Sequence, residues 1–176
     1  MCEYNLDAEV CWIKNPRLRE LVTEILEHAP AQFWTAPSSR SGKHHPTDEF
    51  DTGGRILHTK RVVRVAKDLA RSFNMSQRET DWAIAGALVH DMGMHVADDV
   101  YYGHGGLLLN VVKEFKSQLD ILNDQYIVRL AEIVQLHMGV FDAPFRVAWD
   151  DKVALVLQLS DYVASRTYIK VDVDAD

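Results

Sequence analysis

Histidine and aspartate residues occupy positions of this chain that an amphipathic helix would bury. His58 lies four residues before Val62 on one apolar stripe, and His90 ends a second stripe. His137 and Asp161 share two further stripes with leucine and valine residues. One such histidine alone would be a hydrogen-bonded core residue, but a buried carboxylate is costly unless a cation or donors compensate its charge. Because helix bundles build metal sites from side chains on facing helices, four such residues favour a metal centre.

Asp91 directly follows His90, and neighbouring side chains on a helix point about 100° apart and do not face each other. The two can still chelate one ion that lies between their directions. This works best at a helix end, where Gly93 places the pair. The alternative is an ordinary C-terminal turn in which the histidine interacts favourably with the helix dipole. The pair alone leaves both interpretations open.

The spacing of apolar residues predicts six helices, and hence an all-α, single-domain bundle that spans residues 1–176. We expect these helices at about 16–29, 54–73, 77–91, 104–119, 123–137 and 151–166. Residues 30–54 are rich in proline, glycine and serine and lack periodicity, which is loop composition, and a loop of this length suggests a function. The short acidic tail, residues 167–176, is expected to fray.

The composition excludes several classes of protein. The 176 residues are 47% hydrophobic and 26% charged, with a formal net charge of -7. An acidic chain has no broad positive field for a polyanion, so long nucleic acid is not an expected partner. No apolar run approaches the ~20 residues that span a bilayer, and the N-terminus lacks a signal-peptide pattern, so no membrane association is expected. Cys2 and Cys11 cannot form a Cys-x-x-Cys zinc site, and a cytoplasmic location is the simplest interpretation.

Three segments around the histidine and aspartate residues resemble motifs of a known family. They are Gly53–Thr59, Ala87–Gly93 and Ser160–Arg166. Over about residues 36–166, the chain resembles the HD superfamily of metal-dependent phosphohydrolases, whose metal ligands lie in such motifs. The resemblance implies an all-α helical bundle, in agreement with the periodicity. The residues that it implies as ligands of a first metal ion are His58, His90, Asp91 and Asp161.

His104 and His137 lie where the dinuclear branches of this family place two further histidines, and in that scheme Asp91 bridges the two ions. Those branches include cyclic dinucleotide phosphodiesterases, hydrolases of symmetrical dinucleoside polyphosphates and a few di-iron oxygenases. The alternative for His104 is a loop residue that binds no metal. Imidazole and carboxylate ligands suit one or two ions of Fe, Mn, Co, Ni or Zn, whereas Mg²⁺ is less favoured because it prefers oxygen ligands.

The loop before His58 is also similar to the corresponding segment of HD-type exoribonucleases, in which the loop folds over the site. Its cationic side chains could hold substrate phosphate, as could Arg61 on the following helix. The loop residues in question are Arg40, Lys43, His44 and His45. The alternatives are a solvated loop with scattered charge and a solvent-facing position for Arg61.

One position departs from the family pattern. Many members carry a lysine or glutamate where this chain has Met94, and that residue contacts phosphate or serves as general acid. The proton donor would then be another residue, such as His95, Asp98 or Asp99. We expect Asp91 and His95 to act in the hydrolysis of a nucleotide or another small phosphomonoester or phosphodiester by a metal-activated water. The alternatives are a di-iron oxygenase with the same ligands and a nucleotide-sensing binding module.

Overall fold

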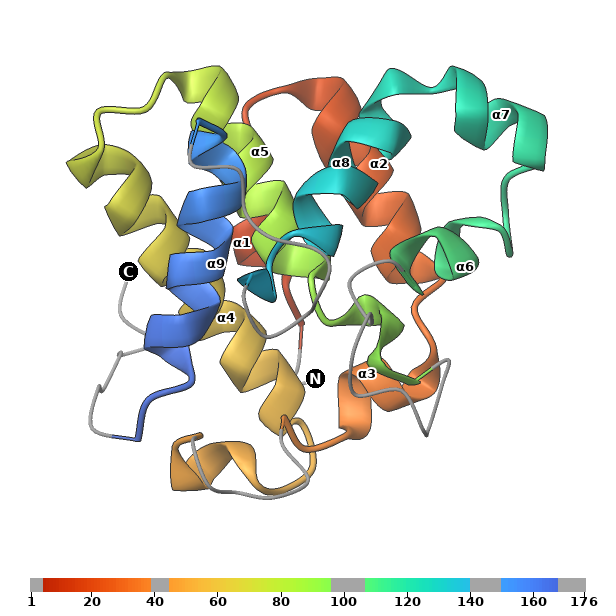
Figure 1. Ribbon diagram of the computed structural model, residues 1–176. Coiled ribbons are helices and arrows are strands. Elements are labelled where there is room, and N and C mark those ends of the chain that lie inside the picture. The colour runs from red at the N-terminus through yellow and green to blue at the C-terminus, as the bar shows by residue number, and fades with distance from the viewer. Residues whose placement is uncertain (1–4, 39–44, 96–106, 140–149, 168–176) are drawn as a thin grey trace.

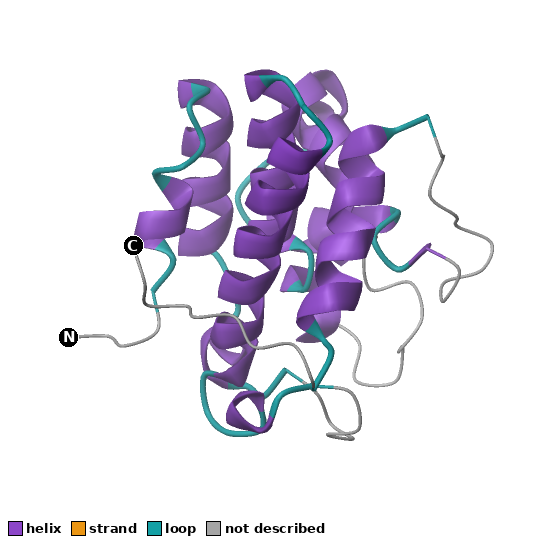
Figure 2. Cartoon of the chain, turned by 90° about the vertical axis from the view of Figure 1, so that its left-hand side faces the viewer, coloured by secondary structure: helices purple, strands orange, loops and turns teal. Residues whose placement is uncertain are grey.

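The computed structural model describes residues 5–38, 45–95, 107–139 and 150–167, and the side chains of residues 94 and 95 lie outside the described part. Every regular element in these ranges is a helix, which confirms the predicted all-α fold (Figure 1, Figure 2). The elements are α1 (Asp7–Val10), α2 (Pro16–Glu27), α3 (Ala31–Thr35), the 3-10 helix η1 (Thr47–Glu49), α4 (Gly54–Ser72), α5 (Gln77–Val89), the 3-10 helix η2 (Met92–His95), α6 (Leu108–Val112), α7 (Gln118–Asn123), α8 (Gln125–Gln135) and α9 (Lys152–Ala164). None of the described helices is both long and apolar enough to cross a membrane.

The starts of the long helices follow from local capping. The side chain of Asn15 accepts a hydrogen bond from the Leu18 backbone, and proline occupies the first position of α2. Ser76 and Glu79 form a complete capping box at α5. Asp151 accepts from two backbone N–H groups at the start of α9. Since each cap satisfies otherwise unpaired backbone donors, these boundaries could be predicted from the sequence.

Two predicted helices were wrong in extent. The helix expected at 104–119 is divided in its described part into α6 and α7, because Ser117 caps a new helix by accepting from the Asp120 backbone. The helix expected to carry His137 ends at Gln135, so His137 lies in the turn that follows α8. The sequence also gave no sign of α1 and α3, since four or five residues are too short to show periodicity.

The core lies around α5, which contacts α2, α4, α8 and α9 (Figure 1). Its buried small residues, including Ala83 and Gly86, allow close approach of Ile133 from α8 and Leu157 from α9. Helices α4 and α5 run antiparallel, whereas α8 and α9 run in the direction of α5 (Figure 1). The first turns of α4 therefore meet the C-terminal ends of α5, α8 and α9 at one end of the bundle.

The loop before α4 is held against that same end of the bundle. The backbone N–H groups of Gly53 and Arg55 donate to the carbonyls of Thr35 and Ala36, both at 3.1 Å. Gly53 adopts a left-handed conformation with φ of 80°, which glycine tolerates without steric cost. The chain thereby turns sharply from the loop into α4.

Gly54 makes the closest backbone approach in this turn. A Cβ at this position would lie 2.0 Å from the carbonyl oxygen of Glu49 and 2.5 Å from its carbonyl carbon. Backbone atoms cannot rotate away as a side chain can, so Gly54→Ala must displace η1. We expect the substitution to lower the free energy of unfolding by about 1–3 kcal/mol in urea denaturation.

Gly86→Ala is the matched control for Gly54→Ala. Its Cβ would meet methyl groups of Ile133 and Leu157 at 3.0 and 3.1 Å, and these side chains can adjust. Alanine also favours a helix interior over glycine by roughly 0.5–1 kcal/mol, which offsets part of the crowding. Equal destabilisation by the two substitutions would contradict the special role of the Gly54 approach.

Candidate metal centre

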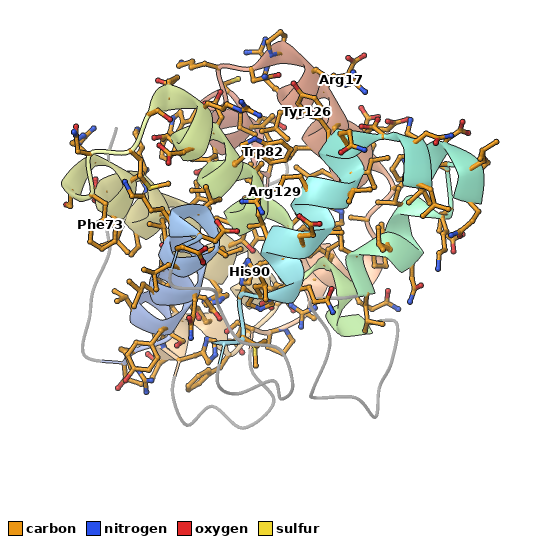
Figure 3. The ribbon with its side chains drawn as sticks, turned by 45° about the horizontal axis from the view of Figure 1, so that its top comes forward. Arg17, Phe73, Trp82, His90, Tyr126 and Arg129 are labelled. Carbon is orange, nitrogen blue, oxygen red and sulfur yellow. The ribbon has the colours of Figure 1, made fainter. Side chains whose placement is uncertain are left out.

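Five predicted residues meet at the end of the bundle where four helices converge. This His–Asp cluster comprises His58, His90, Asp91, His137 and Asp161. His58 comes from the second turn of α4 and Asp161 from the last turn of α9, whereas the other three follow the ends of α5 and α8. Figure 3 shows His90 at the end of α5, beside α8 and α9. The structure therefore brings together residues that the sequence places on four separate helices.

The ligand-type atoms of the cluster lie close together. Nε2 of His58 donates to Oδ1 of Asp161 at 3.0 Å, and the same carboxylate oxygen lies 3.9 Å from Nε2 of His90. Oδ2 of Asp91 lies 3.5 Å from Nε2 of His90 and 4.0 Å from Nε2 of His58. Metal–ligand bonds are about 2.0–2.3 Å long, so atoms separated by 3–4 Å can share one ion. His58, His90 and Asp161 form a group that could hold a metal ion.

His137 lies beside this group. Its imidazole ring packs edge-on against that of His90, with 5.2 Å between the ring centroids, and the His90 and His58 rings are 5.4 Å apart. The three imidazoles thus form a continuous row from α4 to the turn after α8. Gly139 ends that turn with φ of 55°, next to the side chain of Gln158 on α9.

Backbone carbonyls set the orientation of two of the histidines. Nδ1 of His90 donates to the carbonyl of Ala87 at 2.8 Å, and Nδ1 of His137 donates to the carbonyl of Val134 at 2.6 Å. These bonds place the proton on Nδ1 and leave Nε2 with the lone pair that a metal requires. Nε2 of His90 is buried and makes no hydrogen bond. A buried polar atom in this state is costly, and a bound cation would remove the cost.

The charges around His58 also fit a cation. Burial alone would lower the pKa of His58, but the carboxylates of Asp161 and Glu49 on either side of the ring outweigh burial and raise it to about 10. Burial would raise the pKa of Asp161, yet His58 and the neighbouring imidazoles lower it to about 2. The cluster therefore holds a proton between two carboxylates, in the place where a metal ion could supply the positive charge instead.

Glu49 is the residue of this site that the sequence did not reveal. Its side chain is fully buried, and its Oε2 accepts hydrogen bonds from Nδ1 of His45 at 2.8 Å and Oγ of Ser38 at 2.9 Å. Oε2 also lies 3.5 Å from Nδ1 of His58, and Oε1 pairs with Arg61. Burial would raise the pKa of Glu49, but its hydrogen bonds with His45 and Arg61 and the nearby imidazole of His58 hold the pKa far below its usual range. The only sequence signal for Glu49 was its position four residues after His45. Such spacing indicates neighbouring side chains only within a long helix.

The residues predicted to bind phosphate have different positions. His45 lies at the edge of the cluster, with its ring centroid 4.9 Å from that of His58. Arg61 is buried, and its guanidinium group pairs with Asp48 and Glu49. The solvent-facing alternative for Arg61 is therefore wrong, and its predicted contact with phosphate stays a prediction. The predicted residues outside the described ranges are Arg40, Lys43, His44, Asp98, Asp99 and His104, and the side chain of His95 is likewise not described.

The donor set indicates which ions the centre would suit. All atoms of the cluster are imidazole nitrogens or carboxylate oxygens, and the described Cys11 is exposed on the N-terminal part of the chain. Mixed nitrogen and oxygen ligation suits Fe, Mn, Co, Ni or Zn, with no bias toward a structural thiolate site. The residues present therefore fit a divalent transition metal.

Comparison with known proteins agrees with this geometry. A family model described as HD domain matches residues 55–166. The matched span contains the whole His–Asp cluster and excludes the loop that carries His45 and Glu49. Searches among curated proteins and among solved structures found no match.

Proposed function

Because this chain belongs to the HD domain family, we propose that it is a metal-dependent phosphohydrolase that acts on a nucleotide or another small phosphoester. The observation that carries the proposal is the convergence of buried imidazoles with one buried and one half-buried carboxylate at one end of four helices, with an unbonded Nε2 on His90. Two carboxylates beside three imidazoles are costly to bury in a structural core unless a cation compensates their charge.

In this proposal, His58, His90, Asp91 and Asp161 hold the first ion. His137 would contribute to a second ion together with His104, and Asp91 would lie between the two. A bound divalent ion would polarise a phosphoryl oxygen and make a water molecule acidic enough to attack phosphorus at neutral pH. The carbonyl-bound Nδ1 protons of His90 and His137 hold both rings with Nε2 as the nitrogen that would face an ion.

Substrate would approach the centre past Asp161 and His45. The side chain of Asp161 is 23% exposed, whereas those of His58 and His90 are 1% exposed, so Asp161 is the member of this group that solvent reaches most. His45 is 18% exposed and has its Nδ1 occupied by Glu49, which leaves Nε2 as the nitrogen available to a phosphate oxygen. A small phosphorylated molecule suits this approach, and the net charge of -7 disfavours a long polyanion.

The general acid is proposed to be His95, because Met94 cannot donate a proton. A substrate with a good leaving group needs less help from an acid. We therefore expect an activated aryl phosphodiester or a nucleotide anhydride to be hydrolysed faster than an unactivated ester.

The decisive experiment measures product release from a panel of nucleotides and phosphodiesters, in air and under strict exclusion of oxygen. Protein is stripped with a chelator and reloaded with Mn²⁺, Fe²⁺, Co²⁺ or Zn²⁺ before each assay. We expect phosphate or nucleotide release only after reloading, at equal rates with and without oxygen. Strict dependence on dioxygen, with no anaerobic release, would contradict the hydrolase and favour the di-iron oxygenase.

A further inference from the structure

The buried carboxylate of Glu49 lies directly behind the His–Asp cluster, in a segment that the HD family match does not cover. We propose that Glu49 is a positioning residue of the metal centre, which holds the His58 ring with Nε2 directed to the ion. The inference rests on the proposed function, since it concerns the same metal. Glu49 would touch neither the ion nor the substrate and would act through His58.

The contrast among the three histidines motivates this assignment. His90 and His137 each donate Nδ1–H to a backbone carbonyl three residues earlier. Nδ1 of His58 makes no such bond, and it faces Oε2 of Glu49 at 3.5 Å. A shift of roughly half an ångström would bring the pair to ordinary hydrogen-bond length. Glu49 is therefore placed to do for His58 what backbone carbonyls do for the other two rings.

The carboxylate is itself fixed on every side. Ser38 and His45 donate to Oε2, and Arg61 pairs with Oε1 and with Asp48. The carbonyl oxygen of the same residue accepts from the backbone N–H of Ser38 at 3.0 Å. A carboxylate acceptor that cannot rotate imposes one orientation on its partner histidine, and its charge raises the basicity of the opposite nitrogen.

A second metal ion at this position is the competing interpretation. His45, Glu49 and His58 also bring ligand-type atoms close enough to hold an ion. However, the guanidinium group of Arg61 already provides the positive charge on Glu49. An ion there would also require His58 to coordinate through both nitrogens. Hydrogen bonding from His58 to Glu49 satisfies the same atoms without a second charge.

Glu49→Gln tests the proposal with minimal change of shape. Zn²⁺ and Co²⁺ affinities are measured by chelator competition on the full chain, because these readouts do not depend on turnover. We expect affinity to fall about 10–100-fold, the usual effect of losing an outer-shell partner of a metal-bound histidine. In the Zn²⁺-loaded protein, ¹⁵N spectra of the histidine rings should show a changed Nδ1 signal for His58 and unchanged signals for His90.

Glu9→Gln is the matched control. Among the described residues, Glu9 is the other glutamate with a buried side chain. Like Glu49, it pairs with a cation of α4, in this case Lys60 at 3.9 Å. It lies on α1, outside the His–Asp cluster. We expect metal affinity in this variant to equal that of the wild type, since Glu9 does not contact a histidine of the centre.

The double variant Glu49→Gln/Arg61→Gln separates positioning from charge balance. Glu49→Gln should also lower stability, because the buried guanidinium group of Arg61 loses one of its two carboxylate partners. Removal of both charges should recover this stability, while the loss of affinity remains. Recovery of wild-type affinity in the double variant would overturn the proposal, because the single variant would then act through the charge of Arg61, which keeps only Asp48 as its partner. Metal affinity equal to that of the wild type in Glu49→Gln would overturn the positioning role of Glu49 but leave the proposed function in place. A wild-type protein that binds no metal would overturn both.

Discussion

Asp91→Asn is expected to lose bound metal and turnover together. Oδ2 of Asp91 lies within 4.0 Å of Nε2 of both His58 and His90, so this carboxylate faces the position of an ion from the side of α5. Asparagine keeps the size but removes the negative charge and one acceptor oxygen. Loss of an outer-shell partner alone typically costs about 10–100-fold in affinity, so loss of a direct ligand should exceed ~100-fold. Metal content after dialysis and the release of phosphate measure both effects on the same sample.

Asp81→Asn provides the control for Asp91→Asn. Asp81 is also buried on α5, but at its N-terminal end, where its oxygens accept from the backbone N–H groups of Lys14 and Asn15 at 3.0 and 2.8 Å. We expect this variant to lose about 1–3 kcal/mol of stability and to keep its metal. Unchanged metal content in Asp91→Asn, or equal loss in both variants, would contradict the assignment of Asp91.

The apparent affinity for metal is expected to rise by about tenfold per pH unit between pH 7 and 9. The carboxylates of Asp161 and Glu49 outweigh burial and raise the pKa of His58 to about 10, so the ring is protonated throughout this range. An ion bound to Nε2 must displace that proton, and each displaced proton gives one power of ten per pH unit. Isothermal titration in buffers of different ionisation enthalpy counts the protons released. Affinity that does not depend on pH, without proton release, would contradict this prediction.

The stability of the metal-free protein should fall over the pH range in which the affinity for metal rises. The pKa of His58 is raised from 6.5, so its contribution is fully present below pH 6.5 and is lost as the pH rises toward 10. The pKa of Asp161 is lowered from 3.8 to about 2, so its contribution is present above pH 3.8 and is lost as the pH falls toward 2. The combined contribution is largest between about pH 4 and 6.5. The thermal unfolding temperature of the metal-free protein should therefore fall from pH 7 to 9. Saturating metal should reduce this fall.

The sequence alone determined the fold class and the positions of the cluster residues. Helix periodicity and caps are local properties, so Asn15, the Ser76 capping box and Asp151 mark helix starts before any packing is known. Polar residues on apolar stripes are equally local signals. His58 and Asp161 lie 103 residues apart, yet each could be identified as facing inward because its own helix is amphipathic.

Tertiary structure decided the features that depend on contacts between distant segments. The expected helix at 104–119 is divided where Ser117 starts a new helix, and His137 lies beyond the end of α8. Periodicity favours continuation at both places. The Ser117 cap is a local signal that the periodic pattern masked, whereas the end of α8 before His137 emerged only in the folded chain. Arg61 shows the same limit, because a helix position does not reveal that two loop carboxylates pair with its guanidinium group.

Glu49 is the clearest case of a role that only the tertiary structure defines. Its neighbours in the sequence form no periodic pattern, and an acidic residue in a loop is ordinarily solvated. Its burial depends on the close approach to Gly54, the partner Arg61 on α4 and the ring of His58. Free energy favours a buried carboxylate only when all of these partners are in place at once. The residues that we propose as metal ligands could therefore be predicted one helix at a time, whereas the carboxylate that we propose orients His58 required the assembled fold.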